Sequence, residues 1–225
     1  KNATILLACD QNAAVWMYGK YSKTAIIINL PVNCNQLLYN EKRRLDIKKK
    51  LNIQNQIVYG FIGRFVKQKN PLFLIEIYKE IYEINKNTIL ICVGKGELKQ
   101  QAIKLSDELL IKRNVVFIDN IPNASAIIDS FDALLLPSIY EGFPTVLIEA
   151  QANGLTSFVS DKVTNRIKMT DLINFISLEK TAKDWAAIIC NKTEERKKEH
   201  PNTSGGENIG FFVVYSGCSA SGFGL

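Results

Sequence analysis

Short apolar runs alternate with amphipathic segments along most of the chain. The runs at 24–30, 56–63, 88–94, 114–119, 133–137, 156–160 and 174–178 are almost wholly apolar and predict strands. The segments at 41–50, 71–85, 97–110, 124–131, 144–153 and 184–198 predict helices. Asn70-Pro71 is typical of a helix start and Asn153-Gly154 of a helix end. The pattern therefore predicts an α/β fold in which helices cover both faces of a parallel sheet.

In a parallel sheet of this kind, ligands bind beyond the carboxyl ends of the strands. The loops expected at that end are 63–70, 94–97, 119–123, 138–144 and 160–164. The candidate functional residues are those that these loops contain or lead into.

The first of these loops combines a glycine with two cations. Gly63 lets the backbone pass close to a ligand. Arg64 offers a planar fork of donors and Lys69 a point charge, and both suit a diphosphate. The helix that begins near Pro71 adds the positive end of its dipole. Taken alone, the segment is also consistent with a surface loop that carries two cations.

The loop 138–144 leads into a helix whose start can hold an anion. Pro144 is well placed as the first helical residue, because its missing N–H group is not needed there. The backbone N–H groups of Gly142, Phe143 and Thr145 are then left without partners in the helix. Those donors are available to a negatively charged group.

Two carboxylates flank the same helix start. Glu141 stands just before it, and Glu149 falls within the apolar run 146–150. A carboxylate on a largely buried helix needs a hydrogen-bonding partner, which ribose hydroxyls would supply. In the alternative interpretation, Glu149 is a structural carboxylate paired with a lysine or arginine of the core.

Several motifs in order resemble glycosyltransferase family 4, the glycosyl transferases group 1. Glu141 and Glu149 form a Glu-x7-Glu pattern that follows Pro-Ser and precedes Ala-Gln-Ala-Asn-Gly. The segments 63–71 and 93–97 are also similar to this family, and 159–171 is similar to its bacterial polysaccharide branch. The resemblance runs from about residue 4 to residue 198. It implies a Rossmann-like, doubly wound parallel sheet, equivalent to the C-terminal, donor-binding domain of a GT-B enzyme.

The resemblance also implies roles for individual residues. Arg64 and Lys69 bind the donor diphosphate, and Glu149 holds the ribose. Glu141, with the backbone of Gly142 and Phe143 and the helix start at Pro144 and Thr145, faces the donor sugar and phosphate. Gly63 lets the backbone approach the donor, and the turn from Gly94 to Gly96 and the loop at Ile121 border the base. No cofactor or metal is implied, and the sequence contains no Asp-x-Asp pair.

The function implied is retaining transfer of a sugar from a nucleoside-diphosphate sugar to a saccharide or lipid-linked acceptor, in polysaccharide biosynthesis. The alternative is a non-catalytic nucleotide-binding module that acts with a partner chain. Departures from the family pattern at Lys95, at 29–32 and at Asn165 leave the donor base and sugar open.

The expected organisation is one donor-binding domain over 1–199, including part of the interdomain junction. The tail 200–225 is rich in glycine and is expected to be poorly ordered or an edge strand at best. Because the resemblance starts near the domain junction, the N-terminal acceptor domain is expected to be missing and the isolated chain to be inactive.

The composition argues against several kinds of site and segment. Hydrophobic residues make up 47% of the chain, and no apolar run reaches the roughly 18–20 residues that cross a bilayer. The five cysteines are not spaced as Cys-x-x-Cys, and Cys9 and Cys92 are expected to be buried thiols in a reducing, cytoplasmic compartment. The only histidine, His200, lies in the polar tail, which excludes a Ser-His or Cys-His pair in the core.

The net charge of +6 suits an anionic ligand. The densest basic stretch, 41–50, is expected to be a solvated helix face. Docking to anionic lipid at the inner face of the membrane is the alternative. Nucleic acid is disfavoured, because no aromatic-plus-basic RNA motif accompanies the run.

Overall fold

A computed structural model describes residues 5–8, 11–28, 37–119 and 124–193. The chain divides into two compact units, 1–34 with 207–225 and 35–206, which are described separately. The division near residue 35 falls inside the range 1–199 that the sequence suggests as one domain. Cys9, Ile121, His200 and the glycine-rich tail lie outside the described residues.

The first unit contains a short parallel pair of strands with a helix between them. β1 (Leu7–Ala8) pairs with β2 (Ile26–Ile27), and α1 (Gln11–Tyr18) and the 3-10 helix η1 (Gly19–Thr24) connect them. The Tyr18 hydroxyl donates a hydrogen bond to the Leu7 carbonyl at 2.6 Å, which ties the end of α1 to β1. The apolar run at 24–30 predicts a strand, and β2 lies within it, whereas α1, which is only eight residues long, is not predicted.

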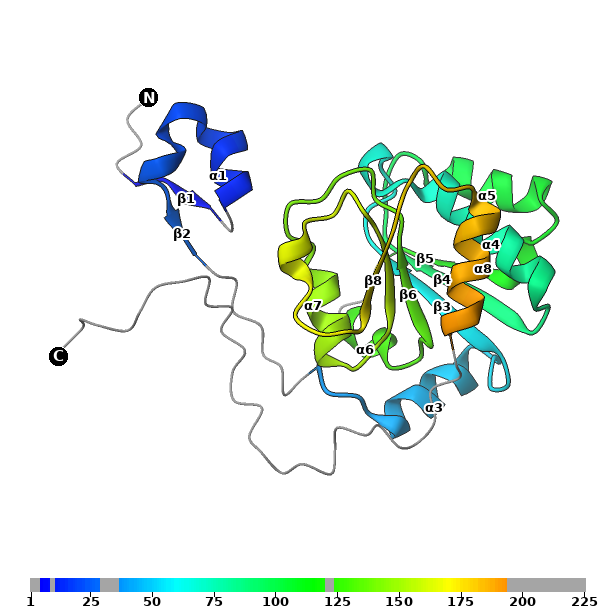
Figure 1. Ribbon diagram of the computed structural model, residues 1–225. Coiled ribbons are helices and arrows are strands. Elements are labelled where there is room, and N and C mark those ends of the chain that lie inside the picture. The colour runs from blue at the N-terminus through cyan, green and yellow to red at the C-terminus, as the bar shows by residue number, and fades with distance from the viewer. Residues whose placement is uncertain (1–4, 9–10, 29–36, 120–123, 194–225) are drawn as a thin grey trace. The chain divides into compact units, whose positions relative to one another are not determined.

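The second unit is built on a sheet of six parallel strands (Figure 1). These are β3 (Ile57–Ile62), β4 (Thr88–Val93), β5 (Val115–Ile118), β6 (Ala133–Leu136), β7 (Ser157–Ser160) and β8 (Ile173–Ile176). Their order across the sheet is β5-β4-β3-β6-β7-β8, so the chain starts in the middle, winds to one edge, and returns to build the other half. This is the doubly wound, Rossmann-like arrangement that the sequence resemblance implies, and the prediction is confirmed.

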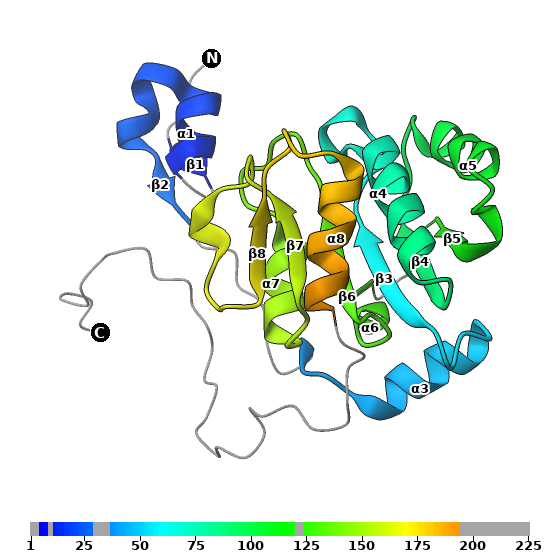
Figure 2. The same ribbon diagram turned by 45° about the vertical axis from the view of Figure 1, so that its right-hand side comes forward.

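Helices cover both faces of this sheet. They are α3 (Glu41–Lys50), α4 (Pro71–Ile84), α5 (Lys99–Glu108), α6 (Ala124–Ile128), α7 (Thr145–Ala152) and α8 (Ala182–Lys192), with 3-10 helices η2 (Lys67–Lys69), η3 (Lys112–Asn114) and η4 (Asn165–Ile167). α4 and α8 pack side by side on one face, with α5 beside α4, whereas α7 lies on the opposite face (Figure 2). Every helix predicted after residue 40 is present, and all but the last lie within a few residues of their expected bounds. The last was predicted for 184–198, but α8 ends at Lys192, and residues 194–198 lie outside the described ranges.

The helix ends explain why these bounds could be predicted. Asn70 caps the start of α4 in the left-handed region, with a φ of 54°, and Pro71 is the first helical residue. At the end of α7, Asn153 is the C-cap and Gly154 follows with a φ of 72°. One expected start is wrong by one residue. Pro144 has an extended backbone and is the N-cap of α7, so the helix begins at Thr145.

The core lies on both sides of the central strands. All residues of β4, β6 and β7 are buried, as expected for parallel strands covered by helices. Trp185 of α8 is fully buried and packs edge-on against Phe73 of α4, with ring centroids 6.0 Å apart. The Cys92 thiol is buried as predicted, and this burial raises its pKa.

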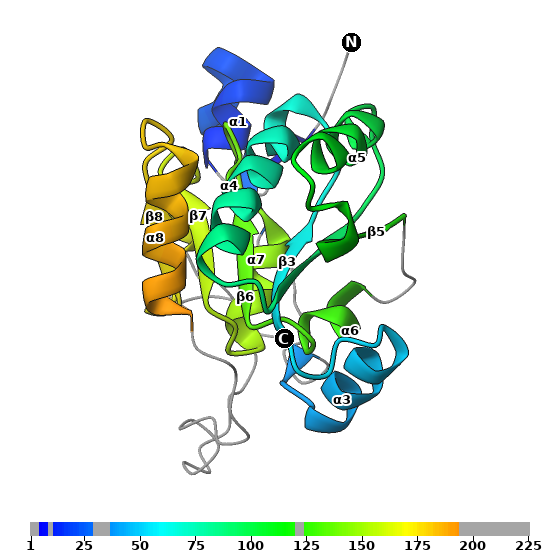
Figure 3. The ribbon, with the colours of Figure 1, turned by 90° about the vertical axis from the view of Figure 1, so that its right-hand side faces the viewer.

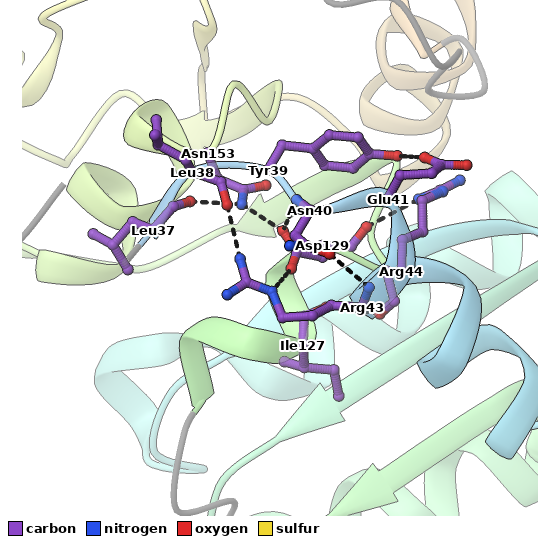
Figure 4. Close-up of polar contacts among 11 residues, drawn as sticks. Leu37, Leu38, Tyr39, Asn40, Glu41, Arg43, Arg44, Ile127, Asp129 and Asn153 are labelled. Atoms are coloured by element: carbon purple, nitrogen blue, oxygen red, sulfur yellow. Dashed lines mark hydrogen bonds and ion pairs between the residues drawn. The ribbon is translucent and has the colours of Figure 1, made fainter. Parts of the chain in front are cut away.

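A buried polar cluster joins the start of α3 to the end of α7 (Figure 4). The Asp129 carboxylate is inaccessible to solvent and forms an ion pair with Arg43. It also accepts hydrogen bonds from the backbone N–H of Asn40 at 3.2 Å and from the side-chain amide of Asn153 at 2.8 Å. The same amide donates to the Leu37 carbonyl at 2.8 Å. These bonds satisfy polar groups that would otherwise be costly to bury.

The basic stretch 41–50 is only in part the solvated helix face that its sequence predicts. Lys42, Lys49 and Lys50 are exposed, but the other cations are half-buried or buried. Arg44 and Lys48 are only 3% and 2% exposed. Arg44 forms an ion pair of 2.7 Å with the buried Asp132, and Lys48 donates to the Gln56 carbonyl at 2.9 Å. With Arg43 bound to Asp129, half of the cations in the stretch serve the fold. Fewer charges therefore remain for docking to anionic lipid.

Within the described ranges no helix is long and apolar enough to cross a membrane.

Candidate functional site

The candidate site lies at the carboxyl ends of β3 and β6, which are neighbours in the middle of the sheet (Figure 3). The chain leaves β3 toward one edge of the sheet and leaves β6 toward the other. Loops that diverge in this way open a crevice, and doubly wound folds bind ligands there. Arg64 and Lys69 follow β3, and Glu141 follows β6, so all three expected catalytic residues lie in these two loops.

The loops meet through the Glu141 carboxylate. Its Oε1 forms an ion pair with the Lys69 ammonium group and accepts a hydrogen bond from the Ser138 hydroxyl at 3.0 Å. Its Oε2 accepts from the Gln68 side-chain amide at 3.3 Å. The Lys69 and Glu141 side chains are 13% and 7% exposed, so this ion pair is largely shielded from water. Sequence reasoning missed Gln68 and Ser138, although both stand inside motifs that it used.

The end of β7 and the loop after it contact the backbone of Glu141 and Ser138. Glu141 forms an isolated parallel bridge with Val163, in the loop after β7. The Ser160 hydroxyl donates to the Ser138 carbonyl at 2.5 Å and accepts from the Lys162 N–H at 3.1 Å. These contacts fix the backbone on which the Glu141 side chain stands.

Arg64 lies on a loop whose backbone is held in place. Arg64 itself is exposed, while the next residue, Phe65, is fully buried against Phe61. The Gly63 N–H donates to the Val93 carbonyl at 3.0 Å, and the Phe65 N–H donates to the Lys95 carbonyl at 2.8 Å. Arg64 is therefore exposed to solvent on a backbone that hydrogen bonds hold in place.

The turn after β4 packs directly against the Arg64 loop, backbone to backbone. Gly94 has a φ of 145°, and a Cβ atom added there would lie 1.9 Å from the Gly63 carbonyl oxygen. Gly96 has a φ of 154°, and its added Cβ atom would lie 2.3 Å from the Phe65 carbonyl oxygen. Only glycine allows this approach, which gives the Gly-Lys-Gly motif a structural reason.

Lys99 and Asp119 lie beside the turn after β4 and were not among the predicted site residues. Their side chains form an ion pair, and the Lys99 ammonium group also donates to the Gly94 carbonyl at 3.3 Å. The hydrogen bond from Lys99 holds the pKa of the Asp119 carboxyl below its usual value. Lys95, between the two glycines, is exposed.

The start of α7 completes the site. Gly142 and Thr145 are exposed and Phe143 is half-buried. Since α7 begins at Thr145, the first N–H groups of the helix have no carbonyl within it to bond, and they can bind an anion. Glu149 is half-buried and lies one turn after Thr145, on the same side of α7.

Residues 43–200 match the family described as glycosyl transferases group 1. The chain belongs to this family. The family resemblance of the sequence is thereby confirmed.

Individual relatives agree with this assignment. EpsF of Bacillus subtilis (strain 168) is 27% identical over 194 residues, which are 84% of this chain and 50% of EpsF. The UDP-Gal:alpha-D-GlcNAc-diphosphoundecaprenol alpha-1,3-galactosyltransferase of Escherichia coli is 33% identical over 162 residues, 64% of this chain and 41% of the enzyme. The chain thus spans about half the length of the curated relatives it matches.

A solved structure shares the fold. The crystal structure of Anabaena HepE in complex with UDP-glucose superimposes with a TM-score of 0.73 at 16% identity, covering 85% of this chain and 54% of HepE. At this level of identity the likeness concerns the fold, which both chains share.

Proposed function

We propose that this chain is the donor-binding half of a retaining glycosyltransferase that takes a nucleoside-diphosphate sugar. The observation that carries the proposal is the meeting of Lys69 and Glu141 at the ends of β3 and β6, beside Arg64 and the start of α7. Anabaena HepE, which shares the fold, was crystallised in complex with UDP-glucose, and this supports the same class of donor for the present chain.

The diphosphate is the part of the donor that this site suits best. Arg64 supplies a planar pair of donors and Lys69 a point charge. The N–H groups at the start of α7 add the positive end of the helix dipole. These groups neutralise the diphosphate without a metal in the proposed complex. As the bond between sugar and phosphate breaks, negative charge builds on the leaving phosphate, and the same fixed groups stabilise it.

The rest of the donor fits the neighbouring elements. Glu149 binds the ribose hydroxyls, and the turn from Gly94 to Gly96 borders the base. The loop at Ile121 would complete the base site. Glu141, with the backbone of Gly142 and Phe143, faces the sugar and the phosphate.

The acceptor is proposed to be a saccharide or a lipid-linked saccharide in polysaccharide biosynthesis. The name of the Escherichia coli relative, which acts on a diphosphoundecaprenol-linked sugar, supports this class. Because the relatives are about twice as long as their matching segments, we propose that an acceptor-binding half outside residues 1–225 completes the active site. Closure of such a half excludes water and brings the acceptor to the donor.

Calorimetric binding tests the donor site. UDP, GDP, ADP and their sugar derivatives are titrated into this chain, into Arg64→Ala and into Lys67→Ala. Lys67 is an exposed cation in the same loop and serves as the matched control for the charge change. We expect one nucleoside diphosphate to bind with a Kd between about 1 μM and 1 mM. Arg64→Ala should weaken it by roughly tenfold or more, because charge-assisted hydrogen bonds contribute about 1.5–3 kcal/mol. No binding by the unaltered chain, or equal losses in the two variants, would contradict the proposed donor site.

Transfer assays test the enzyme assignment against a non-catalytic nucleotide-binding module. Residues 1–225 alone should bind the donor yet transfer no sugar. Joined to the acceptor half of a relative such as the Escherichia coli galactosyltransferase, the chain should transfer it with retained anomeric configuration, which NMR of the product reports. Robust transfer by residues 1–225 alone would refute the half-enzyme proposal, and an inverted product would refute retention.

A further inference from the structure

Gln68, in the loop after β3, forms hydrogen bonds with three consecutive residues of the loop after β6. Its backbone carbonyl accepts a hydrogen bond from the Ile139 N–H at 2.8 Å. Its side-chain amide donates to the Tyr140 carbonyl at 3.1 Å and to Glu141 Oε2 at 3.3 Å. One residue of the β3 loop therefore fixes both the backbone and the carboxylate of the β6 loop.

The Glu141 carboxylate is held by one charged donor and two neutral donors. Lys69 is charged and, in the proposed function, is required by the donor diphosphate. Gln68 and Ser138 are neutral, and a neutral amide or hydroxyl is attracted to a diphosphate much less strongly than an ammonium group is. When a diphosphate binds Lys69, the donors that stay on Glu141 are Gln68, on Oε2, and Ser138, on Oε1.

A carboxylate that is 7% exposed cannot exchange lost partners freely for water. Without Gln68, Oε2 loses its donor and the Tyr140 carbonyl loses its bond to the same amide. The side chain of Glu141 can then rotate out of the position that it holds between Lys69, Gln68 and Ser138. The bond from the Ile139 N–H to the Gln68 backbone carbonyl survives in any side-chain variant, so the two loops remain joined.

We infer that Gln68 is a positioning residue, which holds the Glu141 carboxylate toward the donor sugar while Lys69 binds the diphosphate. The inference rests on the proposed function. It predicts that the Gln68 amide matters for the sugar part of the donor and hardly for the nucleoside diphosphate.

The test compares UDP with UDP-glucose as probes, with GDP and GDP-mannose or ADP and ADP-glucose used instead if the unaltered chain prefers them. Calorimetry is run on the unaltered chain, Gln68→Ala, Gln68→Met and Lys67→Ala. Gln68→Met keeps the length of the side chain and removes only the amide. Lys67→Ala changes the neighbouring exposed residue of the same 3-10 helix.

Both Gln68 variants should bind the nucleoside diphosphate within about twofold of the unaltered chain and the sugar nucleotide roughly fivefold more weakly, the effect of one lost hydrogen bond. Lys67→Ala should leave the ratio of the two affinities unchanged. A purely structural Gln68 would weaken both ligands equally or neither, and either result would overturn the inference. If no probe binds the unaltered chain, the proposed function itself fails, which is a separate outcome. If Gln68→Ala does not fold, Gln68→Met alone decides.

Discussion

The ammonium group of Lys69 forms an ion pair with the carboxylate of Glu141, although the two residues follow different strands. The pair exists because β3 and β6 are neighbours in the sheet and both point their carboxyl ends to the same edge. In the proposed function, the donor diphosphate replaces the Glu141 carboxylate as the anion beside Lys69.

Lys69→Ala should lower both nucleotide affinity and stability. It removes a cation from the diphosphate and leaves a mostly buried carboxylate without its counter-ion, which costs about 1–3 kcal/mol. Arg64→Ala should weaken nucleotide binding but leave the melting temperature nearly unchanged, because Arg64 is exposed. Differential scanning calorimetry with and without UDP separates the two effects.

The double variant Lys69→Ala/Glu141→Gln should regain part of the melting temperature that Lys69→Ala loses. Failure to regain any would mean that the unpaired charge is not the cause.

Glu149→Gln should weaken nucleoside-diphosphate binding more than pyrophosphate binding. Only the nucleotide carries ribose hydroxyls, and a carboxylate accepts hydrogen bonds from both of them more strongly than an amide oxygen does. Isothermal titration with the two ligands measures the difference. Equal losses for both, or extensive unfolding of the variant, would point to a structural Glu149.

Arg44→Met should destabilise the chain by about 3–5 kcal/mol, the usual cost of breaking a buried ion pair from one side. The variant removes the ion pair that Arg44 forms with the Asp132 carboxylate, while the other oxygen of that carboxylate still accepts from the Val58 N–H at 2.7 Å. Urea denaturation gives the free energy of unfolding. Lys42→Met, at an exposed position of the same helix, should change it by less than about 0.5 kcal/mol. Similar values for the two variants would refute the structural role of Arg44.

Gly94→Ala should disturb the Arg64 loop. The added methyl group would lie 1.9 Å from the Gly63 carbonyl oxygen, at a φ that alanine rarely adopts. We expect a loss of stability of at least about 1–3 kcal/mol and weaker nucleotide binding. Gly19→Ala is the matched control, because its φ is also positive, at 54°, but nothing lies within 4 Å of the new methyl group. If both variants lose the same stability and nucleotide binding is unchanged, backbone strain alone explains the glycine.

Local sequence determined most of the elements. Strands such as β4 and β6 are apolar throughout because both faces of a central parallel strand are buried, and this shows in the sequence without any knowledge of neighbours. Asn70-Pro71 and Asn153-Gly154 marked helix ends because their backbone preferences are local. The motifs also placed Arg64, Lys69 and Glu141 in loops of the correct edge. Pro144 was misplaced by one position, since a proline suits both the cap and the first turn of a helix.

Tertiary structure alone decided which polar groups meet. The cations of 41–50 are predicted to form a solvated basic face because their sequence is charged. Yet Arg43 and Arg44 pair with Asp129 and Asp132, which are more than 80 residues away in the sequence. Gln68 and Ser138 gained a role only when the order of the strands brought β3 beside β6. The sequence by itself determined which residues could form strands and helices, and which loops carry the candidate site. The packing of the sheet decided which charges are buried and which stay exposed, because burial and pairing depend on residues that are distant in the sequence and adjacent only in the fold.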